Sequence, residues 1–152
     1  MSVKSFGAKI FAKIVKAQIN RWANNPIQTQ EKVFKNLITT AQNTLFGRDH
    51  HFREINSAKE FSKKVPIRDY EALKPYIDKV VAGEKDILWK GKPIYFAKTS
   101  GTTSGAKYIP ITKESIPSHI NGARNAILNY IAETGNNEFV DGKMIFLQKM
   151  FF

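Results

Sequence analysis

The apolar positions of the N-terminal half of the chain recur at helical spacing. Between residues 1 and 25, one apolar stripe with lysines on its other side predicts an amphipathic helix; its members are Phe6, Ile10, Phe11, Ile14, Val15 and Trp22. A second stripe predicts a helix over about 29–46 with Gly47 as its C-cap; it contains Val33, Leu37, Ile38, Ala41 and Leu45. We expect the first helix to pack on its own domain as a surface helix.

Two shorter helices are predicted between residues 57 and 83. Ser57 and Glu60 have the spacing of a capping box, which indicates a short helix after Ser57. Asp69 is a good N-cap for the next helix, and Gly83 is a good terminator. The apolar stripe of this helix consists of Tyr70, Leu73, Ile77 and Val80.

The pattern changes from about residue 87 onward. The segment "ILWKGKPIYFAK" is β-branched and aromatic around a glycine turn, which predicts strand, turn and strand, and "YIPIT" predicts a further strand. Thr112 is expected to cap a helix over about 113–132, with Pro117 in its first turns. After a loop at 135–143, "MIFLQ" predicts another strand. We therefore expect an α/β fold with a mainly helical segment at 1–92 and an α/β region at 93–152.

Composition limits the classes of protein that remain. The 152 residues include no cysteine, which excludes disulfides and thiolate chemistry, and no apolar run is long enough to cross a bilayer. Lys9, Lys13 and Lys16 interrupt any signal-peptide core. We expect a cytoplasmic protein without stable membrane insertion, and its oligomeric state stays open.

The net charge of +11 is carried mainly by lysine, with 19 lysines against five arginines. Arginine is the residue favoured for bidentate recognition of phosphates and bases, so scattered lysines favour a solvated surface over a nucleic-acid interface. The adjacent His50 and His51 have diverging side chains and no second ligand pair, which favours a surface or interface pair over a metal site.

Candidate chemistry is concentrated in "KTSGTTSGAKYIPIT", residues 98–112. Gly101 and Gly105 allow positive φ, so that successive backbone N–H groups can line one concavity and bind an anion. Neutral donors come from Ser100, Thr102, Thr103 and Ser104, and Lys107 adds a point charge. The spacing differs from that of the P-loop. From these residues alone, a phosphate site and a simple turn between strands are both open.

The stretch "TSGTTSGAK" resembles the Ser/Thr/Gly-rich phosphate loop of the adenylate-forming superfamily, usually close to T-S-G-T-T-G-x-P-K. Ser104 before the second glycine and Ala106 in place of proline depart from that pattern. With "GRDHHF" and "VPIRDYEALKPYIDKVVAGE" upstream, residues of about 30–148 are similar to the auxin-responsive promoter family of acyl-acid amido synthetases.

The resemblance implies an activity and a set of binding residues. Family members use ATP and Mg²⁺ to activate a carboxylic acid as an acyl-adenylate and then transfer the acyl group to an amino acid. By residue match, the ATP phosphates would be lined by Thr99, Ser100, Gly101, Thr102, Thr103, Ser104, Gly105 and Lys107. The match supplies no catalytic residue and no metal ligand.

The resemblance also implies that residues 93–152 begin an incomplete mixed-sheet adenylation core. Family members are several times longer, so we expect this chain to be an N-terminal fragment that cannot catalyse adenylation alone. Two alternatives are a truncated nonenzymatic remnant and a basic module that binds nucleic acid or an anionic membrane through residues 1–25.

Overall fold

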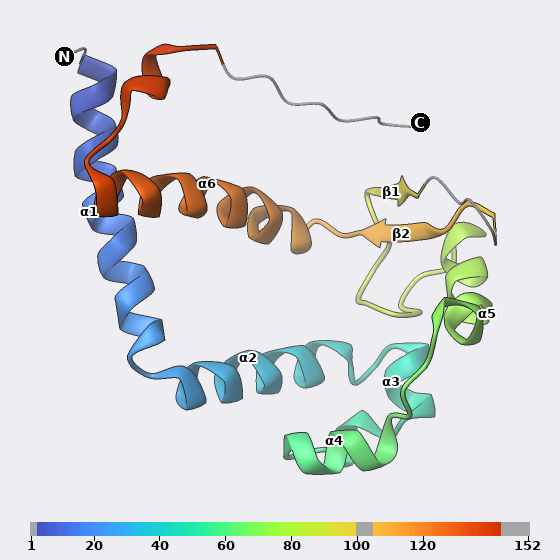
Figure 1. Ribbon diagram of the computed structural model, residues 1–152. Coiled ribbons are helices and arrows are strands. Elements are labelled where there is room, and N and C mark those ends of the chain that lie inside the picture. The colour runs from blue at the N-terminus through green and yellow to red at the C-terminus, as the bar shows by residue number, and fades with distance from the viewer. Residues whose placement is uncertain (1–2, 100–104, 144–152) are drawn as a thin grey trace. The chain divides into compact units, whose positions relative to one another are not determined.

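A computed structural model describes residues 3–99 and 105–143 of the chain. The helical elements precede a two-stranded antiparallel sheet, and a long helix follows it, which confirms the predicted α/β class with a helical N-terminal segment (Figure 1). The elements are α1 (Val3–Ala23), α2 (Pro26–Ala41), α3 (Leu45–Asp49), η1 (Phe52–Glu54), α4 (Ala58–Lys64), α5 (Tyr70–Val81), β1 (Tyr95–Lys98), β2 (Tyr108–Ile111), α6 (Ser115–Thr134) and η2 (Glu138–Asp141). The strand predicted at 144–148 lies outside the described residues.

The described chain packs as two compact units. Unit 1 contains residues 3–29 and 114–143, and unit 2 contains residues 30–99 and 105–113. The division predicted at residues 92 and 93 concerns a change in sequence pattern, and it stays a prediction.

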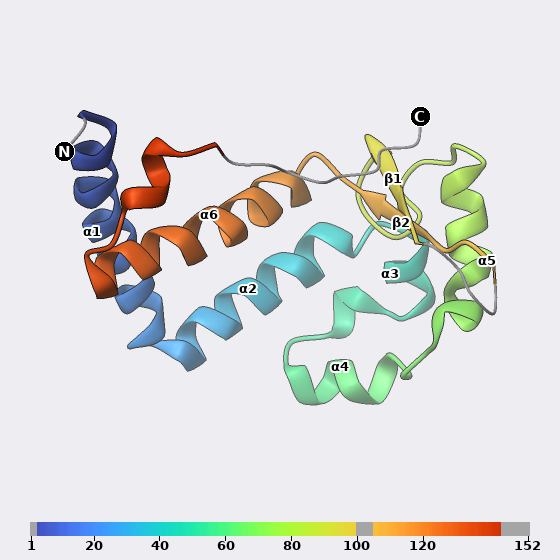
Figure 2. The same ribbon diagram turned by 45° about the horizontal axis from the view of Figure 1, so that its top comes forward.

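Unit 1 is built on the packing of α1 against α6, which cross in both views (Figures 1 and 2). Its core consists of Ala12 and Val15 from α1 with Leu128 and Ile131 from α6. An ion pair of 2.8 Å between Lys16 and Glu133 lies beside this core. Small residues on α1 allow the two helices to approach closely, and burial of the core side chains stabilises the pair.

The buried face of α1 is not the stripe expected from the sequence. Val15 is buried, but the bulkier Phe6, Ile10 and Ile14 are about half exposed, at 56%, 48% and 50%. At 100° per residue, those three lie opposite the face of Ala12 that packs on α6. The first helix therefore packs on its own unit as predicted, but through its small residues.

The helix expected over 29–46 is two helices. α2 ends at Ala41, and Thr44 then begins α3, because its buried hydroxyl accepts the N–H of Gly47 at 3.0 Å and donates to the carbonyl of Ala41 at 2.7 Å. Gly47 is therefore not the predicted C-cap. It lies inside α3, where a Cβ atom would lie 2.1 Å from the Ala41 carbonyl oxygen.

The core of unit 2 lies between α2, η1 and the segments that follow them. Ile38 and Ala41 pack with Phe52 and Ile55. His50 is also buried; its ring stacks on Phe46 at 4.1 Å between centroids. Of the expected surface or interface pair, His51 is exposed, whereas His50 is not on the surface but packs inside unit 2. His50 is kept inside because its Nδ1 atom lies 2.8 Å from the Phe46 carbonyl oxygen.

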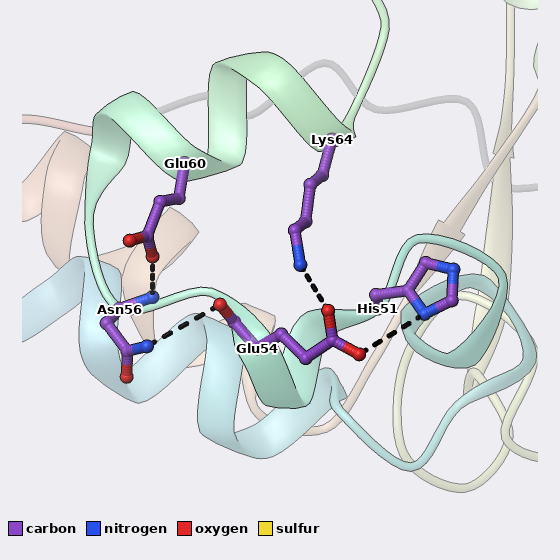
Figure 3. A network of polar contacts seen from close by, with 5 residues as sticks. All are labelled: His51, Glu54, Asn56, Glu60 and Lys64. Atoms are coloured by element: carbon purple, nitrogen blue, oxygen red, sulfur yellow. Dashed lines mark hydrogen bonds and ion pairs between the residues drawn. The ribbon is translucent and has the colours of Figure 1, made fainter.

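The predicted capping box lies at the start of α4. The Ser57 hydroxyl accepts the N–H of Glu60 at 3.2 Å, while the Glu60 carboxylate accepts the N–H of Asn56 at 2.7 Å. Beside it, the Glu54 carboxylate contacts both Lys64 and His51 (Figure 3). These contacts connect α4 to the short helix η1 that precedes it.

The α5 helix begins and ends as predicted. The Asp69 carboxylate accepts the N–H of Ala72 at 2.8 Å, and Gly83 follows the helix with φ of +87°. The strand expected at about residue 87 does not form. Instead, the Asp86 carboxylate accepts the N–H of Gly91 at 2.7 Å, and the carbonyl of Gly91 accepts the N–H of Asp86 at 3.0 Å, which closes a loop.

The last helix begins two residues later than predicted. α6 starts at Ser115 after Glu114, which makes no side-chain cap hydrogen bond, so Thr112 is not its N-cap. Pro117 lies in the first turn as expected, where its missing N–H is least costly. The predicted loop at 135–143 contains the 3₁₀-helix η2, and the Asn137 amide donates to both the backbone carbonyl and the hydroxyl of Ser5 in α1.

Candidate functional site

The hairpin of β1 and β2 holds the two ends of the predicted phosphate loop together. In its register Lys98 lies opposite Tyr108. One step further along, the Thr99 N–H donates to the Lys107 carbonyl at 3.1 Å. The Thr99 hydroxyl also accepts the N–H of Lys107, at 3.3 Å. Residues 99–107 therefore form a loop that is closed at its base by two hydrogen bonds between its first and last residues.

Three of the eight predicted phosphate-binding residues are described, namely Thr99, Gly105 and Lys107. The other five, Ser100, Gly101, Thr102, Thr103 and Ser104, lie outside the described residues. Gly105 has φ of +81°, as its type allows, and no heavy atom lies within 4 Å of the position a Cβ would take. The left-handed conformation turns the backbone two residues before Lys107, and it favours glycine at position 105.

Lys107 supplies a half-buried cation at the end of the loop. Its ammonium lies 5.3 Å from the centre of the Tyr70 ring. None of the ion pairs found among the described residues includes Lys107. An aromatic ring attracts an ammonium without cancelling its charge, so Lys107 retains a full positive charge for an anionic ligand.

The apolar stripe in the sequence predicted that Tyr70 packs in the core, and it gave no indication that Tyr70 contacts the loop. The Tyr70 hydroxyl accepts the backbone N–H of Tyr108 at 2.9 Å, across 38 positions of sequence. Tyr70 is the first residue of α5, directly after the capping Asp69. Helical periodicity carries no signal for such a contact, because the partner is a backbone group in a distant strand.

A second lysine lies at the other end of the loop. The Lys98 ammonium lies 5.6 Å from the centre of the Tyr108 ring. Lys98 and Lys107 thus flank the loop with two cations, while hydroxyl and backbone donors follow between them in the sequence. This set of donors fits phosphate oxygens. Within residues 3–99 and 105–143, no group of three or more His, Cys, Asp or Glu could hold a metal ion.

A separate hollow lies near the far end of β2, at Pro110. Its lining is mainly apolar, with Val80, Ile87 and Trp89 among its walls. The indole N–H of Trp89 is buried and has no partner among the described groups. None of the described phosphate-loop residues lines this hollow, so the two features are distinct.

In the described part of the chain, no helix combines the length and apolar character that a bilayer span requires.

Comparison with known proteins assigns the chain to a family. The sequence model described as "GH3 family N-terminal domain" matches residues 15–150, which is most of the chain. The chain therefore belongs to the GH3 family, as its resemblance to the auxin-responsive amido synthetases predicted.

Individual relatives agree with this assignment. The chain is 32% identical over 100 residues to indole-3-acetic acid-amido synthetase GH3.2 of Arabidopsis thaliana, covering 64% of this chain and 18% of that protein. It is 25% identical over 126 residues to indole-3-acetic acid-amido synthetase GH3.5 of the same plant, covering 82% of this chain and 20% of the relative. A third relative, the 4-substituted benzoates-glutamate ligase GH3.12 of A. thaliana, is 32% identical over 95 residues, or 59% of this chain and 16% of the ligase. The chain thus spans about a fifth of the length of these relatives.

Proposed function

We propose that residues 99–107 bind the phosphates of ATP, and that the chain is the N-terminal part of an ATP-dependent acid–amino acid ligase. The observation that carries this proposal is the closed base of the loop, where Thr99 and Lys107 are joined and the Lys107 ammonium has no carboxylate partner among the described residues. The family match and the names of the relatives support the same chemistry.

The proposed reaction has two steps. A carboxylate oxygen of the acid attacks the α-phosphorus of ATP, and pyrophosphate leaves with the electron pair of the broken P–O bond. The amine of an amino acid then attacks the acyl carbon, AMP leaves, and the amine loses a proton. The first step replaces a poor leaving group by a good one, and the contribution of the loop is to hold the phosphates and offset their charge.

Eight residues of the loop have a role in this proposal. Backbone N–H groups around Gly101 and Gly105, with the hydroxyls of Ser100, Thr102, Thr103 and Ser104, donate to phosphate oxygens. Thr99 closes the loop and Lys107 is the nearby cation. We assign none of them as nucleophile or base. Mg²⁺ enters the proposal as the ion that accompanies ATP.

The proposed partners are a small carboxylic acid and an amino acid, and the proposed location is the cytoplasm. The relatives are named for different acids, indole-3-acetic acid in one case and 4-substituted benzoates in another. The acid of this chain is therefore left at the level of its chemical class.

Titration of the isotope-labelled chain with ATP, followed by amide NMR spectra, tests the proposal and detects even millimolar affinity. We expect saturable shifts at residues 99–107, produced by ATP and by pyrophosphate but not by adenosine. Lys107→Ala should weaken the binding of ATP by about tenfold, as expected for loss of one charge-assisted contact. Lys90→Ala, which removes an exposed lysine from the same unit, is the matched control and should change the affinity less than twofold.

Two results would contradict the proposal. One is a set of shifts that never saturates and spreads over lysines throughout the surface, as a nonspecific anion would produce. The other is an equal affinity of Lys107→Ala and the unaltered chain for ATP. Turnover of ATP to pyrophosphate by the purified chain would separately refute the expectation that it cannot catalyse adenylation alone.

The outer face of α1 favours one alternative, a basic module that binds an anionic surface. The first 30 residues contain no acid, and the exposed Phe6, Ile10 and Ile14 share that face. A basic helix with exposed apolar residues can lie on an anionic membrane. Salt-dependent binding to phosphatidylserine vesicles that is lost in Phe6→Ser/Ile10→Ser would support this alternative, and loop shifts with ATP would support the ligase. A nonenzymatic remnant predicts neither.

A further inference from the structure

Tyr70 contacts the second limb of the phosphate loop at two consecutive residues. Its hydroxyl accepts the N–H of Tyr108 at 2.9 Å, and its ring faces the ammonium of Lys107 at 5.3 Å from the centroid. The side chain comes from the first turn of α5, where the Asp69 cap and its hydrogen bond to Ala72 fix the start of the helix. The N-terminal end of α5 therefore contacts the loop at the residues where the loop joins β2.

The hydrogen bond to Tyr108 is one that the sheet itself cannot make. The Thr99 N–H donates to the carbonyl of Lys107, so the next pair, Lys98 and Tyr108, is of the non-hydrogen-bonded type. The N–H of Tyr108 therefore points away from β1, and the Tyr70 hydroxyl accepts it. The Thr99 hydroxyl likewise accepts the N–H of Lys107. The backbone N–H groups of Lys107 and Tyr108 are therefore both bound by side-chain hydroxyls.

The ring contact restricts the lysine that the proposed site depends on. A lysine ammonium is a point charge on a flexible four-carbon stem, and ordering that stem on a ligand costs conformational entropy. The face of Tyr70 gives the ammonium a favourable position before a ligand arrives, without the neutralisation that a carboxylate would bring. A group that is already ordered loses less freedom when it binds.

We propose that Tyr70 is a positioning residue of the phosphate site, which orients Lys107 through its ring and holds the returning backbone through its hydroxyl. This inference rests on the proposed function, because it assigns Tyr70 to the same ATP phosphates. It adds a residue that lies 37 positions before Lys107 and outside the Ser/Thr/Gly pattern.

Two variants separate the contributions of Tyr70. Tyr70→Phe removes the hydroxyl and keeps the ring, while Tyr70→Leu removes both. The probe is inorganic pyrophosphate, titrated into the full 152-residue chain. We expect pyrophosphate affinity to fall about threefold in Tyr70→Phe and about tenfold in Tyr70→Leu. Tyr130→Phe, an exposed tyrosine of unit 1, is the matched control and should bind as the unaltered chain does.

A double-mutant cycle distinguishes positioning from general damage to the fold. If the ring of Tyr70 acts through Lys107, Tyr70→Leu should weaken pyrophosphate binding only about threefold, instead of about tenfold, once Lys107 is already alanine, because only the hydroxyl contact is then left to lose. If Tyr70 only stabilises the fold, its substitution should cost the same affinity in both backgrounds. Equal losses would overturn the inference, as would equal affinities of Tyr70→Leu and the unaltered chain.

A measurement without ligand keeps the two proposals apart. The ring current of Tyr70 should move the ε-methylene protons of Lys107 upfield of their usual NMR position; the displacement should persist in Tyr70→Phe and vanish in Tyr70→Leu. Absence of the displacement in the unaltered chain overturns the positioning by Tyr70. A chain that shows the displacement but binds neither pyrophosphate nor ATP would refute the proposed function. The assignment of Tyr70 to phosphate binding would fall with it, whereas the contact between Tyr70 and Lys107 would stand.

Discussion

Asn137 and Ser5 form a buried polar pair that joins the two ends of unit 1 across 132 positions of sequence. The Asn137 amide donates to the carbonyl and to the hydroxyl of Ser5, and the two residues are 6% and 4% exposed. Removal of the amide leaves buried acceptors without this donor, which costs more than the loss of an exposed hydrogen bond.

We therefore expect Asn137→Ala to lower the free energy of unfolding by about 1–3 kcal/mol, as measured by urea denaturation. The matched control is Asn20→Ala, which removes an exposed amide from α1 and should change stability by less than about 0.5 kcal/mol. Equal effects of the two substitutions would show that the Ser5 contact adds nothing to stability.

Substitution by alanine should change the stability of the chain in opposite directions at Gly47 and at Gly122. A Cβ at Gly47 would lie 2.1 Å from the Ala41 carbonyl oxygen, which is a backbone clash, so Gly47→Ala should destabilise the chain by about 2 kcal/mol or more. A Cβ at Gly122, within α6, would meet nothing within 4 Å. Gly122→Ala should therefore stabilise by about 0.5–1 kcal/mol.

Thermal unfolding of both variants provides the measurement, and each variant serves as the other's control. A higher melting temperature for Gly47→Ala would mean that α2 and α3 do not meet as described.

Thr99 should affect the binding of ATP through its hydroxyl. Thr99→Val keeps the shape of the side chain but removes the acceptor for the Lys107 N–H. Because this contact closes an exposed loop, we expect ATP affinity to fall about two- to fivefold, which is the usual range for one net hydrogen bond. Thr99→Ser retains the hydroxyl and should stay close to the unaltered chain in the same titration. If Thr99→Ser and Thr99→Val weaken the binding of ATP equally, the Thr99 hydroxyl has no part in the site.

The Glu54 carboxylate should make part of the folding stability depend on pH. The hydrogen bond and charge of Lys64 hold the pKa of the Glu54 carboxyl below its ordinary value, with a smaller contribution from His51 (Figure 3). A carboxyl whose pKa is lower in the folded state adds stability above its unfolded pKa and loses it as the pH falls through the folded value. The side chain is 65% exposed, so the effect is small.

We expect Glu54→Gln to lose less stability than the unaltered chain between about pH 6 and about pH 3, as followed by urea denaturation at each pH. Glu31→Gln removes an exposed carboxylate of α2 and should retain the pH dependence of the unaltered chain. Identical pH profiles for the two variants would exclude a contribution from the Glu54–Lys64 pair.

The sequence predicted those parts of the fold that are determined locally. The helix starts at Ser57 and Asp69 were predictable because a cap and its amide partner lie within three residues of each other. The strand expected at about residue 87 fails for a non-local reason: the carbonyls of Asp86 and Ile87 accept the N–H groups of Leu45 and Phe46 at 2.7 and 2.9 Å. These donors belong to the start of α3, and no pattern near residue 87 could reveal them.

The same distinction applies to the candidate site. The closed loop with a positive φ at Gly105 follows from glycine, hydroxyl and lysine spacing, so it was predictable from a single segment. Tyr70 was not, because its partners, Lys107 and the N–H of Tyr108, lie far away in the sequence and its periodicity is that of any helix face. The sequence also did not predict that the outer face of α1 is exposed. An apolar stripe shows that a helix face can be buried, but the partner helix determines which face is buried.

The hydrogen bond from Tyr108 to Tyr70 also has a kinetic consequence. An amide that points away from the partner strand of a two-stranded hairpin is ordinarily open to water and exchanges its proton without any unfolding. Since the acceptor for this amide is a side chain of α5, its exchange requires the helix and the strand to separate. Tyr108 should therefore exchange as slowly as the docking of α5 allows, and deuterium uptake at this one amide reports when the returning limb of the loop leaves the helix.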